Sequence, residues 1–233
     1  MGNFSEHYVP ENELLKIAGF VCRYSPGNIL LIGGGCVLSE TAGYRRLRCT
    51  SDDLDFIVND EGLSSVRNSL NIHKSEINGE KHDGCSTTHI NEVLIGLFHG
   101  HIRGWRIPDE LFCNPKSVHT SGGEVYVIPA ELNVALKIRR GASKTDNPHV
   151  YGKDALDTAS MYLGMINRME KFDSDYLISN LLNGVCSDCN LSGHNACMHS
   201  LRRSESQVFD SDRLEYSRFM DECSSCVGKI CRK

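Results

Sequence analysis

The chain has 233 residues and a formal net charge of −5. Its length allows one or two domains. Its net charge disfavours a surface built for non-specific nucleic-acid binding but does not exclude a local groove lined by basic residues. Hydrophobic residues make up 40% and charged residues 24% of the chain, as in ordinary globular proteins, and apolar runs such as Ile29–Ile32 and Val93–Phe98 are too short to span a membrane. The first seven residues contain neither the basic nor the apolar segment of a secretory signal, so we expect a cytoplasmic protein without a membrane partner.

The N-terminal half of the sequence alternates between helical and strand patterns. Apolar residues recur at helical spacing from Glu11 to Tyr24, and Ser25-Pro26-Gly27-Asn28 ends this pattern. The apolar run Ile29–Ile32 predicts a short buried strand that leads into three glycines. The elements expected in this half are a helix at 11–24, a strand at 29–32, a helix at 36–42, a strand at 53–58, a helix at 63–70 and strands at 91–98 and 124–128.

Helical patterns dominate the C-terminal half. Pro129 is suited to the first turn of a helix. The elements expected after it are a polar loop at 141–148 and helices at 151–165, 173–182 and 212–222. We therefore predict an α/β (α+β) fold, in which residues 1–128 form a small mixed sheet with flanking helices. Residues 129–233 are expected to form a helical domain that contains a Cys-rich segment at 186–231.

Two aspartates stand one residue apart in the second predicted strand. Asp53 and Asp55 occupy positions i and i+2, so a strand presents both carboxylates on one face. Carboxylate oxygens are the ligands that Mg²⁺ or Mn²⁺ prefers, and the triphosphate of a nucleotide supplies others. A glycine turn after an apolar run, here Gly33-Gly34-Gly35, can bring backbone N–H groups against phosphates. These features together predict a site that holds a nucleoside triphosphate (NTP) through a divalent metal ion.

Three segments of the N-terminal half follow one another in a characteristic order. They are Ile32-Gly33-Gly34-Gly35-Cys36-Val37-Leu38, Gly43-Tyr44-Arg45-Arg46 and Ser51-Asp52-Asp53-Leu54-Asp55-Phe56. This order resembles the signature of the polymerase-β-type nucleotidyltransferase superfamily and is most similar to its minimal, AbiEii-like toxin branch. The resemblance implies that Asp53 and Asp55 are catalytic metal ligands. Arg48 lies one residue further from Asp53 than the family pattern expects. The nucleotide-binding residues that the resemblance implies are Gly33, Gly34, Gly35, Cys36, Arg48 and Ser51.

A third carboxylate normally comes from a neighbouring strand in this family. The segment Ile90–Ile95 resembles that strand, with Glu92 in the place usually held by aspartate, so the resemblance implies a third catalytic metal ligand at Glu92. Asp83 is an alternative, although it lies in a loop-like His82-Asp83-Gly84 context. The other explanation of Glu92 is a solvated charge on an edge strand.

A second block of sequence follows the order seen in the AbiEii-like enzymes. Val125–Leu132 reads as a strand, a proline and Glu-Leu, and a helix with Lys137 and the segment Tyr151–Asp157 come after it. By resemblance, Lys137 would contact the nucleotide phosphates and Asp154 would be a polar catalytic residue of the active site that could serve as a base. Asp154 and Asp157 lie three residues apart, on one helix face. Their alternative role is an acidic pair near a helix N-terminus.

The chain has 11 cysteines, and two pairs near its C-terminus have the spacing of metal ligands. Cys186-x2-Cys189 and Cys223-x2-Cys226 each allow a turn to offer two sulfurs to tetrahedral zinc, so a structural Zn²⁺ is predicted. The alternatives are that these cysteines form a redox pair or are unligated thiols. Disulfides are rare in a reducing cytosol, where we expect this protein. Further possible ligands are His194, Cys197, His199 and Cys231.

The sequence therefore predicts a nucleotidyltransferase that moves a nucleoside monophosphate from NTP to an acceptor hydroxyl by a two-metal mechanism. The toxin resemblance implies that the acceptor is a tRNA 3′ end or another RNA, and that a cognate antitoxin protein exists. Two alternatives stay open. One is a catalytically degenerate member of the fold that serves as a zinc-stabilised binding module. The other is a small-molecule enzyme of the antibiotic-nucleotidylating type.

Overall fold

The computed structural model describes residues 9–40, 53–70, 85–102 and 105–143, together with isolated positions between 157 and 221. The chain divides into two compact units. The first contains residues 1–39, 49–102 and 107–128, and the second contains residues 40–48, 103–106 and 129–233. The main division therefore falls between Ile128 and Pro129.

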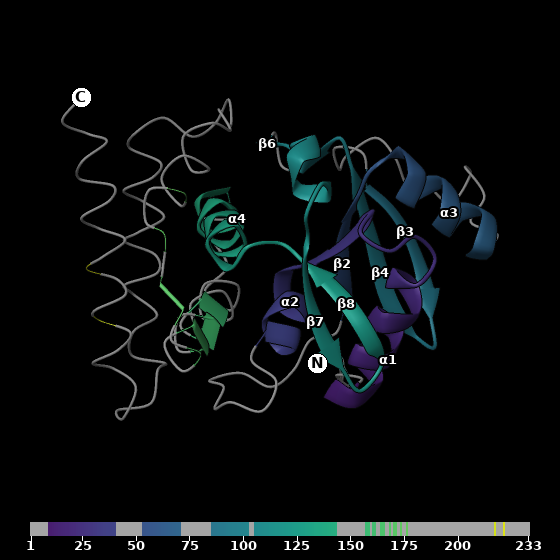
Figure 1. The fold of residues 1–233 in the computed structure, drawn as a ribbon, viewed down its shortest axis with the longest axis horizontal. Coiled ribbons are helices and arrows are strands. Elements are labelled where there is room, and N and C mark those ends of the chain that lie inside the picture. The colour runs from purple at the N-terminus through teal and green to yellow at the C-terminus, as the bar shows by residue number, and fades with distance from the viewer. Residues whose placement is uncertain are drawn as a thin grey trace, which may run out of the picture. The chain divides into compact units, whose positions relative to one another are not determined.

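A six-stranded mixed sheet forms the centre of the first unit (Figure 1). Its order is β3-β4-β2-β1-β8-β7, so β2 lies inside the sheet with a neighbour on each side. The pairs β2–β4 and β1–β8 are parallel, whereas β1–β2, β3–β4 and β7–β8 are antiparallel. The strands are β1 (Ile29–Ile32), β2 (Asp53–Val58), β3 (Cys85–Ile90), β4 (Val93–His99), β7 (Lys116–Thr120) and β8 (Gly123–Val127).

Helices flank this sheet, as the sequence predicted (Figure 1). The apolar stripe of α1 is buried, and this helix contacts β1, β7 and β8. Strand β1 is buried along its whole length, which explains its continuous apolar sequence. The remaining elements of the N-terminal region are α1 (Glu11–Cys22), α2 (Gly33–Glu40), α3 (Asp60–Leu70), a short 3₁₀ helix η2 (Asp109–Phe112), β5 (His101–Ile102) and β6 (Trp105–Arg106).

Asn59 connects β2 to α3. Its side-chain Oδ1 accepts a hydrogen bond from the backbone N–H of Gly62 at 2.9 Å, which is the geometry of a helix N-cap. Its Nδ2 donates to Oδ1 of Asn28 at 2.6 Å and so ties the start of α3 to the segment before β1. The cap explains why α3 begins at Asp60 and not at Leu63, where the sequence pattern placed the first helical residue.

In the second unit, α4 spans Ala130–Ser143, so the predicted polar loop is wrong at its first three residues, 141–143. The described residues near position 160 are helical and lie within the helix expected at 151–165: residues 157–158, 160–161 and 164–165. Glu131 Oε1 accepts a hydrogen bond from the backbone N–H of Asp173 at 2.9 Å. Of the two helices expected later in the chain, the described residues are Asp173, Tyr176, Ser217 and Asp221. Asp173 is not helical, and the other three are.

The structure confirms the predicted strands at 29–32 and 53–58 and shifts several other bounds. Helix α2 begins at Gly33, so the three glycines form its first turn and not a turn before it. The strand expected at 91–98 begins at Val93, and the one expected at 124–128 covers Gly123–Val127. Strands β3, β5, β6 and β7 were not predicted. Within the described part of the chain, no helix is long and apolar enough to cross a membrane.

Candidate active site on strand β2

Asp53 and Asp55 point to one face of β2, as their spacing predicts. Both side chains are half-buried, whereas the intervening Leu54 and the following Phe56 are fully buried. The alternation follows from the two-residue period of a strand, which sends the apolar side chains into the core and the carboxylates to the opposite face. The carboxylates are therefore fixed by a buried strand and still reachable from outside.

The carboxylate of Asp55 lies between two glycines on neighbouring elements. An ideal β-carbon added to Gly96 would lie 2.5 Å from Asp55 Oδ1, and one added to Gly33 would lie 3.5 Å from Asp55 Oδ2. Asp55 pairs with Gly96 across β2 and β4, and with Ile32, the residue before Gly33, across β2 and β1. The two carboxylate oxygens therefore face different sides of β2.

Gly33 joins β1 to α2 with a backbone angle that favours glycine. Its φ is +64°, in the left-handed region that side chains with a β-carbon rarely adopt. Gly34, Gly35 and Cys36 follow it in the first turn of α2. A helix N-terminus carries partial positive charge and so favours an anion. The structure thus brings Gly33, the first of the predicted phosphate-binding glycines, next to the predicted metal ligand Asp55, whereas a β-carbon on Gly35 would meet the side chains of Leu54 and Leu31.

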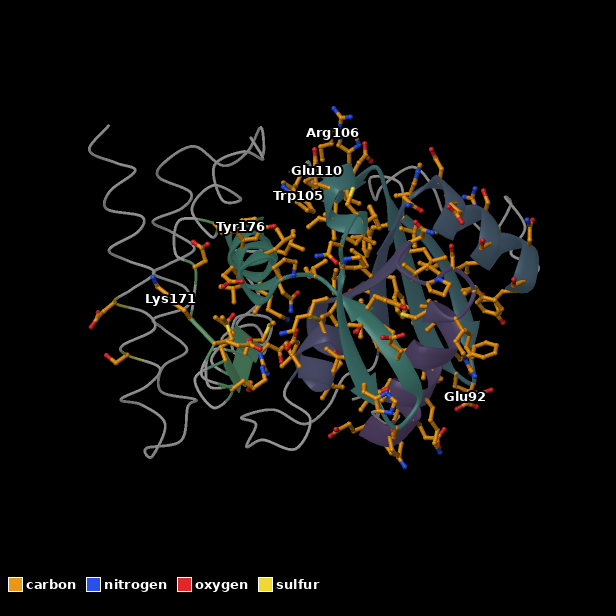
Figure 2. All side chains as sticks on the ribbon, in the orientation of Figure 1. Glu92, Trp105, Arg106, Glu110, Lys171 and Tyr176 are labelled. Atoms are coloured by element: carbon orange, nitrogen blue, oxygen red, sulfur yellow. The ribbon has the colours of Figure 1, made fainter. Side chains whose placement is uncertain are left out.

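Glu92 does not lie on a strand, contrary to our prediction. Asn91 and Glu92 form the two-residue turn between β3 and β4, with φ values of 48° and 68°, and the strand begins only at Val93. Figure 2 shows Glu92 at the outer edge of the first unit, and the residue is exposed. The positions on β4 that face Asp53 and Asp55 are taken by Leu94 and Gly96.

The described residues contain two of the carboxylates expected of a metal site, Asp53 and Asp55. Among them, no three His, Cys, Asp or Glu side chains lie close enough together to hold a metal ion. Mg²⁺ is commonly bound by one or two carboxylates, with substrate phosphates and water as its other ligands. Asp53 and Asp55 supply the carboxylates that a cation binding together with a nucleotide would use.

Sequence reasoning overlooked Gly96, although a signal for it was present. A glycine in the middle of an otherwise apolar strand often marks a close approach of another group. Here the group is the Asp55 carboxylate, and the same position borders the ring of Phe98, whose Cε2 would lie 3.5 Å from an added β-carbon. The structure therefore adds Gly96 to the site residues that the sequence predicted.

The same face of the sheet continues over β3 through Thr87 and Cys85, which pair with Gly96 and Phe98. Burial raises the pKa of the Cys85 thiol to about 11, and the negative charge of Asp55 adds to this increase, while a backbone hydrogen bond at Leu97 opposes it. The pKa increase caused by Asp55 indicates that the carboxylate acts electrostatically on this part of β3.

Lys137 lies in the second unit and is buried, with 4% of its surface exposed. Its Nζ donates a hydrogen bond to Oδ2 of Asp157 at 2.6 Å, and only 2% of the Asp157 side chain is exposed. The nearby Asn133 is also buried, and its Nδ2 donates to Sδ of Met161 at 3.0 Å. Lys137 therefore joins α4 to the helical residues near 160 through a buried ion pair.

Several predicted site residues lie outside the described part of the chain. The structure thus leaves the proposed roles of Asp154 and of the zinc cysteines as predictions. The residues in this group are Arg48, Ser51, Asp83, Asp154, Cys186, Cys189, Cys223 and Cys226, with the further possible zinc ligands His194, Cys197, His199 and Cys231.

No protein-family model matches this sequence, and no curated protein matches it either. The resemblance to nucleotidyltransferases therefore depends on the sequence motifs quoted above.

Proposed function

We propose that this protein is a nucleotidyltransferase that transfers a nucleoside monophosphate from NTP to an acceptor hydroxyl. The observation that carries this proposal is the position of the Asp55 carboxylate between Gly33, at the start of a helix, and Gly96, on a neighbouring strand. This arrangement offers an anion-binding helix start and two carboxylates within one small region of a rigid sheet. Nucleotidyl transfer requires these same two features.

Each residue of the site has a separate task in this proposal. Gly33, Gly34 and Gly35 receive the triphosphate at the start of α2, where the helix dipole favours negative charge. Asp53 and Asp55 orient the nucleotide through a divalent cation, with their positions fixed by the buried strand around Leu54. When bound, Mg²⁺ or Mn²⁺ supplies charge neutralisation for the triphosphate and activation of the acceptor hydroxyl.

We propose a role for Lys137 that differs from the one that the resemblance implies. Its ammonium group is paired with Asp157 inside the second unit, and a buried pair of this kind is costly to separate. We propose that Lys137 and Asp157 stabilise the helical unit. In that case Lys137 does not act as a direct phosphate ligand.

The proposal also covers the acceptor of the nucleotide and the partner proteins of the enzyme. By the motif resemblance, the acceptor is an RNA 3′ end such as that of tRNA, a cognate antitoxin restrains the enzyme, and the protein acts in the cytoplasm. Structural zinc held by Cys186, Cys189, Cys223 and Cys226 completes the proposal.

A catalytically degenerate nucleotide-binding module is the second candidate. It is favoured by the neighbours of the carboxylates on β4, because Leu94 and Gly96 stand where a third acidic residue would complete a metal site. Such a module would bind NTP with metal but would not transfer the nucleotide.

The two candidates are separated by incubating the protein with each α-³²P-labelled NTP and Mn²⁺ in the presence of total RNA, an aminoglycoside or no added acceptor. Label transferred to RNA and lost in Asp53→Asn and Asp55→Asn supports the proposal. Label on the aminoglycoside alone would support the antibiotic-modifying alternative. Binding of NTP without any transfer would favour the degenerate module.

A further inference from the structure

We propose that Arg168 is a positioning residue for the nucleotide site, because it holds the end of the helix that begins beside Asp55. This inference rests on the proposed nucleotidyl transfer and adds to it a residue that acts without touching the nucleotide. The observations that carry it are the contacts of Arg168 with Glu40, the last residue of α2.

The guanidinium group of Arg168 binds Glu40 at two places. Its Nη1 donates a hydrogen bond to the backbone carbonyl oxygen of Glu40, and its Nη2 lies 3.0 Å from the carboxylate oxygen Oε2. The last carbonyl groups of a helix lack partners within the helix and carry partial negative charge, so an arginine is suited to this position. Glu40 and Arg168 both belong to the second unit, which α2 reaches with its last residue. Arg168 therefore fixes the C-terminal end of α2.

Arg168 is itself held in place by its neighbours. Its Nε and Nη2 donate to the two carboxylate oxygens of Glu170 at 2.9 and 2.8 Å, which is the two-bond geometry that suits an arginine and a carboxylate. Its backbone N–H donates to the carbonyl oxygens of Gly164 and Met165, both at 3.1 Å. On the other side of the pair, only 2% of the Glu40 side chain is exposed. These partners give the guanidinium group a fixed orientation, unlike that of a solvated side chain.

Helix α2 is short and closely packed. It has eight residues, and residues 35–40 are buried. A β-carbon on Gly35 would lie 2.7 Å from Cδ2 of Leu54 and 2.9 Å from Cδ1 of Leu31, so the helix lies directly on these side chains. A tightly packed helix of about 12 Å in length moves as one body. A change at one end of α2 therefore reaches the other end.

The other end of α2 belongs to the candidate site. The β-carbon position of Gly33 lies 3.5 Å from Asp55 Oδ2, and the proposed function places the triphosphate at this end of the helix. A misplacement of about 1 Å can cost about 100-fold in rate, even when its cause is far from the reacting atoms. Loss of Arg168 removes its restraint on Glu40 and so displaces Gly33 from the position that the nucleotide requires.

The test separates nucleotide binding from stability. Wild-type protein, Arg168→Met, Arg168→Lys and Arg67→Met are each titrated with every NTP and Mn²⁺ by calorimetry, at a temperature well below the thermal unfolding midpoint of each protein. Arg168→Met removes both contacts with Glu40. Arg168→Lys keeps the charge but lacks the planar fork that serves two acceptors at once, and it carries the test if Arg168→Met does not fold.

Arg67→Met is the matched control. Arg67 is a half-buried arginine on α3, where its Nη2 donates to Oγ of Ser86 at 3.2 Å. Its loss should lower the unfolding midpoint, as the loss of Arg168 does, but it should change NTP affinity by less than about two-fold.

We expect Arg168→Met to bind NTP about 10-fold more weakly than the wild type, and Arg168→Lys to show a smaller loss in the same direction. Folded Arg168 variants that bind NTP with wild-type affinity would overturn the positioning role and assign the pair to stability alone, while the proposed function stands. If the folded wild type binds no NTP with Mn²⁺, the proposed function fails, and this inference fails with it.

Discussion

Asp55 and Gly96 face each other across the parallel strands β2 and β4, and the carboxylate occupies the space that a side chain at position 96 would need. Gly33 lies on the other side of the same carboxylate. This arrangement turns a common sequence pattern, two aspartates one residue apart, into a defined site. The carboxylate can lie against both neighbours because both are glycines, and its strand is held in place by a buried core.

Gly33→Ala should destabilise the protein, because a β-carbon is strained at φ +64°. The added carbon would lie 3.5 Å from Asp55 Oδ2, which is an ordinary contact, so the backbone angle is the main cost. We expect a loss of roughly 1–2 kcal/mol in the free energy of unfolding by urea. Gly33→Asn should cost less, because asparagine tolerates this region better. Equal stability of all three proteins would contradict the backbone geometry described for Gly33.

The buried pair Lys137–Asp157 should matter for stability. Lys137→Met leaves a carboxylate buried without its cation, so we expect the free energy of unfolding to fall by roughly 3–5 kcal/mol. The double variant Lys137→Met plus Asp157→Leu removes both charges and should recover most of this loss. Urea unfolding of the single and double variants gives the coupling free energy. A double variant that is as unstable as the sum of its single variants would show that the pair does not act as a unit.

Cys85 should react slowly with alkylating reagents near neutral pH. Its thiol has a pKa of about 11, so the reactive thiolate is scarce at pH 7–8 and increases as the pH rises toward that value. The charge of Asp55 contributes to the raised pKa, so Asp55→Asn should lower it and speed alkylation at pH 8–9. Peptide mass spectrometry after iodoacetamide pulses measures the rate at each cysteine, with the exposed Cys113 as an internal reference. An unchanged rate at Cys85 in Asp55→Asn would argue against an electrostatic influence of that carboxylate.

The cap of α3 is a third stability test. Asn59→Ala removes the hydrogen bond to the Gly62 N–H and the bond to Asn28, so we expect a loss of about 1 kcal/mol. Asn68→Ala is the control, because Asn68 is exposed within the same helix. Thermal unfolding should show a lower midpoint for Asn59→Ala than for Asn68→Ala. The reverse order would mean that the cap contributes little.

The strands that form the site could be predicted because their own sequences determine them. The run Ile29–Ile32 is apolar without interruption, as expected of a strand buried on both faces, and β2 alternates between carboxylates and apolar residues where one face is open. By contrast, the edge strands β3 and β7 have mixed polar sequences and are held mainly by pairing with a neighbour. Pairing of this kind depends on tertiary context, which a local pattern does not contain.

The error at Glu92 has a local cause that the sequence did contain. Ile90 pairs with Val93, which leaves Asn91 and Glu92 as a two-residue hairpin loop in which both φ angles are positive. Asparagine is favoured at the first position of such loops, so Asn91 was a turn signal inside the predicted strand. Gly96 was overlooked for a different reason. Its role appears only when the register places Asp55 beside it.

The most direct test of the central claim is calorimetric titration of each NTP, with Mg²⁺ or Mn²⁺, into the wild type and into the double variant Asp53→Ala plus Asp55→Ala. We predict metal-dependent binding of at least one NTP by the wild type and its loss in the double variant, with both proteins folded by circular dichroism. Binding that persists unchanged in the double variant would show that these aspartates do not hold the nucleotide. Absence of binding by folded wild-type protein would contradict the proposed nucleotidyltransferase activity itself.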